Sequence, residues 1–336
     1  MNTETSPTPE RIMQFAFGYG PTLIIETALR LRIFDLLDSS PKTVQELSAA
    51  TGASPRGLTA ILNALVGLEF LSCHSGDYAL TPESAAFLVS TKPGFHGTLF
   101  RHTVGQLLPK WQQLPEVVRT GKPAMAVNAH DHGAVFFAEF VESLFPLSYQ
   151  AAKALGEHLQ IAASNTPVSV LDLAAGSGVW GIALAQQSSR VRLRAVDWPE
   201  VLKVTRKVAQ QHGVADRLDL VAGDLETADF GTGHQVATLG HILHSEGRER
   251  SRRLLRKTFD ALSSGGTIAI MEFLPNEERT GPPNALLFAV NMLVNTDHGD
   301  TFTFGEISGW LAEAGFIKPR LLEVPAVSPL ILANRP

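Results

Sequence analysis

The stretch from residue 168 to residue 186, VSVLDLAAGSGVWGIALAQ, constrains the fold more than any other part of the chain. Its first six residues are mostly β-branched or aliphatic with little alternation, which is typical of a parallel strand covered on both faces. Small residues then break the run, and a helix-like repeat follows. Small residues allow backbone N–H groups to approach a ligand, and a helix N-terminus favours negative charge. We expect a strand–turn–helix unit that binds a polar or anionic part of a nucleotide-type cofactor, against the alternative of a tight connection that binds nothing.

Two acidic residues follow at the ends of expected strands. Asp197 ends the run VRLRAVDW, and Asp224 ends the segment VAGD. A carboxylate at the tip of the second strand can accept hydrogen bonds from both hydroxyls of a ribose. Because the carboxyl ends of parallel strands share one edge of a sheet, these acids should converge on one crevice.

The later residues alternate between strand and helix patterns, which predicts an open, mostly parallel, doubly wound α/β sheet. The expected strands are residues 168–173, 191–196, 218–221, 236–239 and 267–271, followed by a terminal hairpin of residues 317–324 and 328–333. Residues 304–315 should form a helix that stops at Gly315.

The N-terminal part predicts a helix-turn-helix followed by a hairpin. Residues 12–37 have helical spacing with a break, Thr43 and Glu46 can form a capping box, and a helix should open at Pro55. Residues 70–74 and 77–80 then form two short strands. Such a winged helix can bind DNA, but Arg56 is the only basic residue of the presumed recognition helix, so a packing and dimerisation module is favoured.

The four segments LDLAAGSG, VDWPEVL, VAGDLE and GHILHSEGRE occur in the order of successive motifs of the class I S-adenosylmethionine-dependent methyltransferases. More narrowly, the chain resembles two-domain small-molecule O-methyltransferases of the caffeate and hydroxyindole type over nearly its whole length. The resemblance implies a Rossmann-like methyltransferase sheet, an N-terminal winged-helix domain that forms a homodimer, and S-adenosylmethionine as cofactor. We expect a dimerisation domain at residues 1–95, a connector at 96–160 that contributes to the substrate pocket, and a cofactor domain at 161–336. The expected cofactor-binding residues are Asp172, Ala174, Ala175, Gly176, Gly178, Asp197, Trp198, Gly223, Asp224, Leu225 and Gly240.

Composition limits the other classes of function. The formal net charge of −5 argues against nucleic-acid and anionic-membrane binding, and the single cysteine excludes an internal disulfide. The N-terminus lacks a signal pattern, and no apolar run has the length of a membrane span. A cytoplasmic enzyme with a small-molecule acceptor is therefore expected.

His244 lies just past the fourth expected strand, and a neutral imidazole there can take the proton of a hydroxyl as it attacks a methyl group. The resemblance implies that His244 is the general base and that Glu272 orients it. The alternatives are a helix-capping or packed histidine for His244 and a solvated strand-end acid for Glu272. His241 is expected on the strand, in a structural role.

The sequence departs from the family at three places. Ala174 and Ala175 replace glycines, Thr301 stands where the family has a further glutamate, and Gly240 replaces a lysine that contacts the cofactor. These changes leave open a carbon, nitrogen or sulfur acceptor, or a cofactor-binding protein with other or no chemistry.

Aromatic residues before the cofactor domain can wall an apolar substrate pocket, although helical spacing makes them core residues first. The pocket candidates are Phe136, Phe137, Phe140, Asn291, Met292 and Asn295. The spacings of His96, His102, His130 and His132 do not match a metal cluster, and no set of acids suggests Mg²⁺. We therefore expect no metal.

Overall fold

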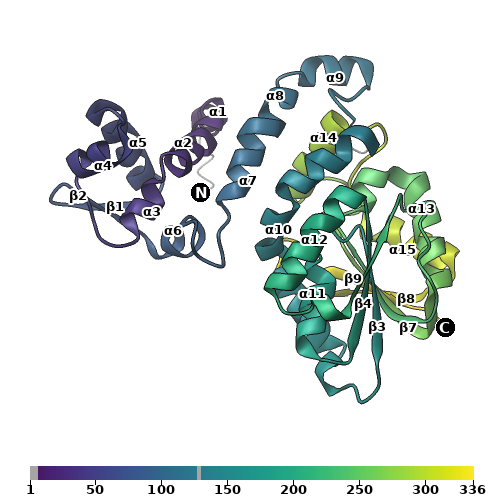
Figure 1. Cartoon of the computed structure of the whole chain (residues 1–336). Coiled ribbons are helices and arrows are strands. Elements are labelled where there is room, and N and C mark those ends of the chain that lie inside the picture. The colour runs from purple at the N-terminus through teal and green to yellow at the C-terminus, as the bar shows by residue number, and fades with distance from the viewer. Residues whose placement is uncertain (1–6, 127–129) are drawn as a thin grey trace, which may run out of the picture. The chain divides into compact units, whose positions relative to one another are not determined.

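The computed structural model describes residues 7–126 and 130–336, and their side chains except those of 130–140 and 143. The chain forms two compact units, residues 1–109 and 110–336 (Figure 1). This division falls after Pro109, whereas the sequence suggested boundaries at residues 95 and 160. Each unit is described by itself.

The first unit has the helix-turn-helix and hairpin that the sequence predicts. The capping box of Thr43 and Glu46 opens one helix, and Gly52, with a φ of 71°, ends it. Between residues 7 and 37 the described chain forms three helices rather than two, because Arg32 takes a left-handed φ of 57° between the second and the third. The elements are α1 (Glu10–Ala16), α2 (Tyr19–Arg30), α3 (Ile33–Leu37), α4 (Val44–Thr51), α5 (Pro55–Gly67), β1 (Leu71–His74), β2 (Asp77–Leu80), α6 (Pro82–Phe87), α7 (Gly97–His102), a π-helical turn (Thr103–Leu107) and α8 (Leu108–Trp111), which runs into the second unit.

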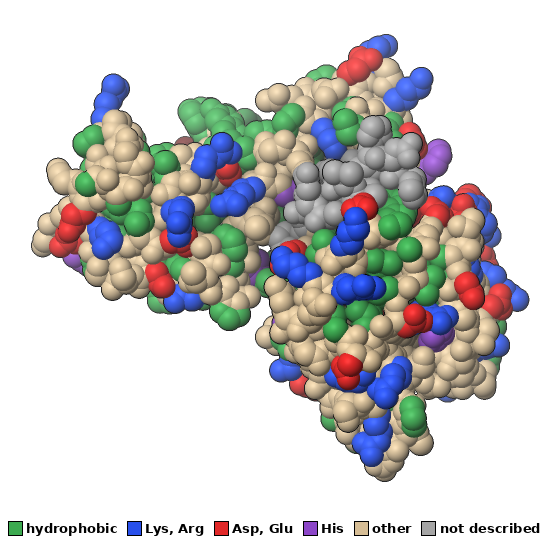
Figure 2. Space-filling view, viewed as in Figure 1, with side chains coloured by type: hydrophobic (Ala, Val, Ile, Leu, Met, Phe, Trp, Pro, Cys, Tyr) green, Lys and Arg blue, Asp and Glu red, His purple; other side chains and the backbone are tan. Residues whose placement is uncertain are grey.

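Helix α1 exposes an apolar surface. Ile12 and Phe15 are 73% and 75% exposed, and Phe17, which caps the helix, is 67% exposed. Figure 2 shows hydrophobic side chains gathered over this helix. The core of the unit lies on the other elements, where Phe34, Leu58 and Leu62 are fully buried. The apolar side chains of α1 therefore do not belong to the core of their own unit.

The second unit is built on a seven-stranded sheet in the order β5-β4-β3-β6-β7-β9-β8. The strands β3 to β7 are parallel, and β9 is antiparallel to both neighbours. The order reverses between β3 and β6, which is where open α/β sheets bind ligands at their carboxyl ends. The strands are β3 (Val168–Leu173), β4 (Val191–Asp197), β5 (Leu218–Ala222), β6 (His234–Gly240), β7 (Leu262–Met271), β8 (Ile317–Leu322) and β9 (Leu330–Asn334).

Helices cover both faces of this sheet (Figure 1). Separate apolar clusters form on the two faces, one around Ile182 and Leu184 and the other around Leu171 and Ile268. The central strands β3, β6 and β9 are therefore buried over most of their length, whereas the edge strand β8 is largely exposed. Burial on both faces explains the near-continuous apolar sequences of the central strands. The helices are α9 (Leu114–Thr120), α10 (His130–His158), α11 (Val179–Gln187), α12 (Pro199–Gln211), α13 (Leu243–Ala261), α14 (Pro283–Asn295) and α15 (Phe304–Ala314), with 3-10 turns at Ile161–Ala163 and Ala215–Arg217. Among the described residues, no helix has both the length and the apolarity needed to cross a membrane.

Candidate active site

The turn between β3 and α11 is held by Asp197 at the end of β4. The backbone N–H of Gly176 donates to Oδ2 of Asp197 over 2.9 Å, and that of Trp198 donates to Oδ1 over 2.7 Å. Ala174 and Gly176 have left-handed φ values of 51° and 56°. Each carboxylate oxygen keeps a second lone pair. Asp197 therefore fixes the loop and can still accept hydrogen bonds from a ligand.

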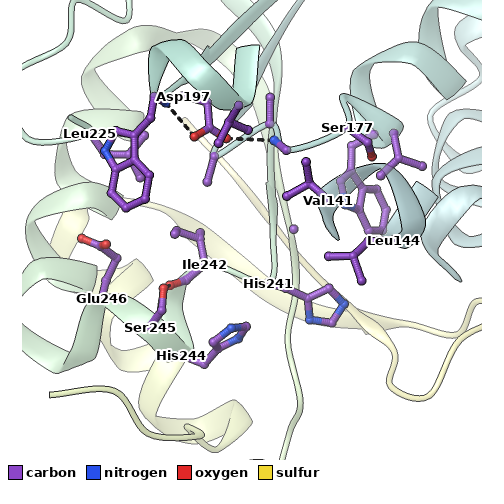
Figure 3. A pocket seen from close by; sticks show the side chains of 18 of the residues that line it. Val141, Leu144, Ser177, Asp197, Leu225, His241, Ile242, His244, Ser245 and Glu246 are labelled. Atoms are coloured by element: carbon purple, nitrogen blue, oxygen red, sulfur yellow. Dashed lines mark hydrogen bonds between the residues drawn. The ribbon is translucent and has the colours of Figure 1, made fainter. Parts of the chain in front are cut away.

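A cavity opens beside this loop at the carboxyl edge of the sheet (Figure 3). Nine of the eleven residues expected to bind the cofactor line it: Ala174, Ala175, Gly176, Asp197, Trp198, Gly223, Asp224, Leu225 and Gly240. His244, expected as the general base, lines the cavity as well. The remaining lining residues were not predicted from the sequence; they are Val141, Leu144, Ser148, Ser177, Val179, Trp180, Val201, His241, Ile242, Ser245, Glu246 and Arg250. The three from α10 follow a helical spacing of three and four residues, which could have indicated one cavity-facing side.

Asp172 and Gly178 do not line the cavity and lie on the opposite side of the loop from it. Asp172 is 1% exposed. Its carboxylate accepts from the Thr238 hydroxyl over 2.8 Å and from the Gly181 N–H over 3.1 Å. Gly178 precedes α11 with a φ of 79°, where a Cβ would lie 2.9 Å from the side chain of Thr205. Both residues shape the turn from the side away from the cavity.

Burial perturbs the pKa values of both aspartates. It raises the pKa of Asp172 to about 7, against the two hydrogen bonds that favour its carboxylate. It also raises the pKa of Asp197 to about 6, against the N–H donors of Gly176 and Trp198. Asp197 is half-buried and faces the cavity, so its charge at neutral pH is available to a ligand.

Position 240 has no room for a side chain in this protein. A Cβ at this position would overlap the indole nitrogen of Trp180, which is itself 4% exposed and packed in the core. The indole therefore fills the space that a side chain at position 240 would need. This packing accounts for the glycine at position 240.

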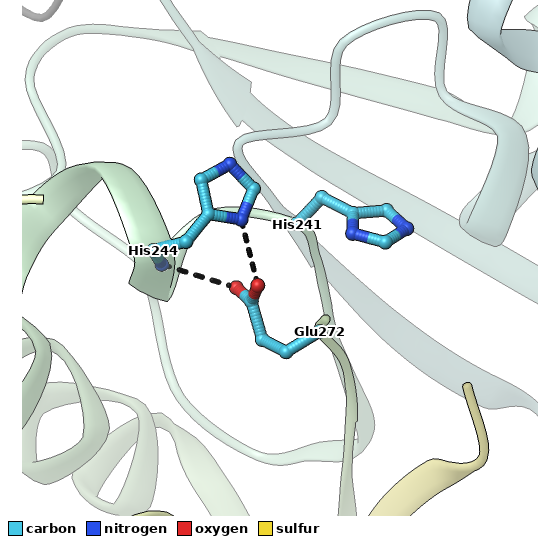
Figure 4. A group of neighbouring side chains, drawn as sticks. All are labelled: His241, His244 and Glu272. Atoms are coloured by element: carbon cyan, nitrogen blue, oxygen red, sulfur yellow. Dashed lines mark hydrogen bonds and ion pairs between the residues drawn. The ribbon is translucent and has the colours of Figure 1, made fainter. Parts of the chain in front are cut away.

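His244 and Glu272 form a buried pair at the cavity (Figure 4). Nδ1 of His244 lies 2.7 Å from Oε2 of Glu272, and the side chains are 10% and 3% exposed. The other carboxylate oxygen accepts the backbone N–H groups of Leu243 at 2.7 Å and His244 at 3.3 Å. Burial by itself would raise the pKa of Glu272. The net shift is nevertheless downward, because the charge and the hydrogen bonds of His244, together with the nearby His241, favour the ionised carboxylate. An ionised carboxylate only accepts, so Nδ1 carries a proton, and in the neutral imidazole Nε2 then keeps its lone pair.

The structure corrects the assignment of His241 to the strand. β6 ends at Gly240, and His241 follows with a left-handed φ of 61° while its N–H donates to the carbonyl of Met271 over 2.8 Å. Its side chain lines the cavity, and its ring lies 4.9 Å from that of Phe273. Burial lowers the pKa of His241 to about 4. The imidazole is therefore neutral near pH 7.

The expected substrate residues on α14 do not line the cavity. Asn291 accepts the indole N–H of Trp111 over 2.9 Å, Asn295 donates to the carbonyl of Asn291, and Met292 is buried. Phe136, Phe137 and Phe140 lie outside the described side chains. Phe288, one turn before Asn291, instead forms a T-shaped contact with the imidazole of His244, with the ring centroids 4.8 Å apart.

Thr301 is buried, and among the described residues its hydroxyl has no hydrogen-bond partner. The preceding Asp300 donates its N–H to the carbonyl of His244 over 2.9 Å. This loop therefore contacts the backbone of His244, and Glu272 holds its imidazole.

Comparison with known proteins gives two family matches that together span most of the chain. Residues 13–90 match the O-methyltransferase dimerisation domain, and residues 111–317 match the O-methyltransferase domain.

Individual relatives agree with these matches. The chain is 28% identical to the 3-hydroxy-5-methyl-1-naphthoate 3-O-methyltransferase of Streptomyces sahachiroi, with 91% of this chain and 89% of that protein covered. It is also 28% identical to the S-adenosyl-L-methionine-dependent methyl transferase PigF of a Serratia species, over 95% and 93% of the two chains. A crystal structure of a putative O-methyltransferase from Nostoc punctiforme is similar with a TM-score of 0.90 and 27% identity, covering 98% of this chain and 100% of that one.

Proposed function

Because the chain belongs to the O-methyltransferase family, we propose that it methylates the phenolic hydroxyl of a small, largely apolar molecule, with His244 as general base and without a metal ion. The chain is a methyltransferase, and its cofactor is S-adenosylmethionine. The observation that carries the proposal is the buried pair of His244 and Glu272 beside a cavity that Asp197 and the glycine loop also line.

The cavity residues fit this cofactor. The loop of small residues allows close backbone contact with the amino-acid end, Asp197 is placed to accept from the ribose hydroxyls, and Trp198 and Leu225 offer apolar surface to the adenine. Asp224 accepts hydrogen bonds from Arg250 at 3.2 and 3.3 Å, which positions its carboxylate at the adenine end. When bound, the cofactor supplies an electrophilic methyl group on a sulfonium.

His244 performs the proton transfer in this proposal. Its Nδ1–H donates to Glu272, so the Nε2 lone pair is available to accept the proton of the hydroxyl as that oxygen attacks. Glu272 fixes this tautomer and stabilises the imidazolium that forms. No step requires a metal ion.

An aromatic acceptor suits the surroundings of His244. The rings of Phe273 and Phe288 stack with their centroids 4.1 Å apart, and Phe288 also makes a T-shaped contact with the imidazole of His244. Flat apolar side chains next to the base favour a flat apolar acceptor and exclude water. The Streptomyces relative acts, by its name, on a hydroxynaphthoate, and we propose a phenol of similar size for this chain.

A labelled-methyl assay tests the function. The purified protein is incubated with methyl-labelled S-adenosylmethionine and with naphthols, hydroxynaphthoates, thiols, anilines and phenols blocked at oxygen, with and without a chelator. We expect label in an aryl methyl ether, at a rate that the chelator does not lower. Label on carbon, nitrogen or sulfur would identify one of the other acceptor classes. Cofactor binding without transfer to any acceptor would contradict the catalytic proposal.

We further propose a homodimer formed through the first unit. Residues 13–90 match a dimerisation domain. The apolar side chains of α1 are not buried by the first unit, and a second copy of the chain would bury them. Light scattering at micromolar concentration should give the mass of a dimer, and replacing Ile12 and Phe15 by Asp should lower it to that of a monomer. A monomeric mass for the unmodified chain would overturn this assembly.

A further inference from the structure

The Nδ1 atom of His241 is a buried polar group that the proposed methyl transfer does not use. The residue as a whole is partly exposed to the cavity, but this nitrogen is buried and has no hydrogen-bond partner among the described residues. Buried polar groups normally have a partner, so an orphaned nitrogen beside a cavity points to a ligand.

Two other ligand atoms converge on the same place. His241, His244 and Glu272 each offer one, and these atoms lie within 4.8 Å of one another. Figure 4 shows a ring nitrogen of each histidine turned toward the carboxylate of Glu272. Two imidazoles and a carboxylate are a ligand set that catalytic zinc sites use, with a fourth position left open.

The distances are compatible with an ion after a small movement. Zinc lies about 2.0–2.2 Å from its nitrogen and oxygen ligands, which places those ligands roughly 3.3 Å apart in a tetrahedral site. The pair of His244 and Glu272 is already closer, at 2.7 Å. His241 is the ligand that must approach, and it stands just past the end of β6 rather than inside the strand.

We propose that His241, His244 and Glu272 bind a zinc ion, and that the bound ion switches off His244 as a base. The reason is the tautomer of the imidazole. A neutral His244 with Nδ1 on the metal must carry its single proton on Nε2, and this is the nitrogen that has to accept the proton of the acceptor. Zinc therefore converts the base into a hydrogen-bond donor, while Asp197 and the loop remain free to bind the cofactor.

Ion binding is tested directly, without any methyl acceptor. Protein dialysed against a chelator and then freed of it is titrated with Zn²⁺ by calorimetry and with Co²⁺ by visible absorption. We expect one ion per chain, and at least a tenfold weaker affinity in His241→Phe, which keeps a ring beside Phe273 but removes both nitrogens. His241→Ala is a second variant, and His74→Ala, at an exposed histidine of the first unit, is the control with unchanged affinity. Equal affinity in the wild type and both His241 variants, or no binding at millimolar ion, would overturn the site.

The effect on rate rests on the proposed function and is measured separately. With an acceptor that the wild type methylates, saturating Zn²⁺ should lower the rate by about 10²-fold or more, as expected for loss of a general base, and EDTA should restore it. S-adenosylhomocysteine affinity should not change with Zn²⁺. The rate of each His241 variant, relative to its own metal-free rate, should be insensitive to Zn²⁺ at concentrations that inhibit the wild type. Zinc bound through His241 with no change in rate would refute the switch and retain the site, whereas absent methyl transfer in metal-free protein would refute only the proposed function.

Discussion

The imidazole of His244 is hydrogen-bonded to Glu272, which lies 28 residues later in the chain. The distance from Nδ1 of His244 to Oε2 of Glu272 is 2.7 Å. One carboxylate oxygen binds the ring, and the other binds the backbone N–H groups of Leu243 and His244. A single side chain thus fixes both the start of α13 and the tautomer of the base. The two effects can be separated by substitution.

His244→Ala should lower methyl transfer by about 10²–10⁴-fold, the usual contribution of a general base. Affinity for S-adenosylhomocysteine should be unchanged, because the loop and Asp197 are untouched. Single-turnover rates and calorimetry measure the two quantities. A wild-type rate in this variant would remove His244 from the role of base.

Glu272→Gln should be about as damaging as His244→Ala. The amide oxygen can replace the acceptor of the two backbone N–H groups, which leaves the amide NH₂ facing Nδ1 of His244. Nδ1 must then accept, so the ring proton moves to Nε2 and the base is lost. Glu272→Ala is the comparison, since it has no amide group that forces the proton of His244 onto Nε2. A faster reaction in the Ala variant than in the Gln variant would support this explanation, and the opposite order would contradict it.

Cofactor affinity should depend on the charge of Asp197. Burial raises the pKa of this group to about 6, and a bound ribose favours the carboxylate as acceptor. Affinity should therefore be constant above this pH and fall by about tenfold per pH unit below it. Calorimetry with S-adenosylhomocysteine between pH 5 and pH 8 measures the dependence. Asp197→Asn should bind more weakly at pH 8 with a flatter profile, and a wild-type profile in this variant would assign the titration to another group.

The sequence predicted those features that depend on local pattern and on the topology of parallel strands. Apolar runs predicted the strands β3 to β7, of which the central β3 and β6 are buried on both faces. The ends of the strands placed Asp197 and Glu272 at one edge of the sheet. The position of His241 could not be predicted, because it depends on where β6 ends, and a shift of one residue turns a strand side chain into a cavity side chain. The cavity face of α10, which includes Val141 and Leu144, depends on how distant segments pack.

The buried carboxyl of Asp172 should make stability depend on pH. Burial raises its pKa from 3.8 to about 7, so between these values the folded chain holds a proton that the unfolded chain has released. The free energy of unfolding contributed by this group is therefore highest below pH 4 and falls as pH rises to about 7, by up to roughly 1.4 kcal/mol per pH unit. Asp172→Asn cannot titrate. Urea denaturation from pH 4.5 to pH 7.5 should show the wild type losing stability relative to the variant, and parallel profiles would contradict the shift.

The packing of Gly240 against Trp180 should appear as non-additive stability. Gly240→Ala places a Cβ on the indole nitrogen of a buried tryptophan, and overpacking of this kind costs about 1–3 kcal/mol. Trp180→Phe removes that nitrogen, so the double variant should be more stable than the sum of the two single changes by about 1 kcal/mol. Gly309→Ala is the matched control, because a Cβ in the middle of α15 meets no atom within 4 Å, and its stability should be unchanged or higher. Denaturant unfolding of the wild type, the two single variants, the double variant and the control gives the coupling energy. Additive effects at positions 240 and 180 would mean that the indole of Trp180 is not what excludes a side chain at position 240.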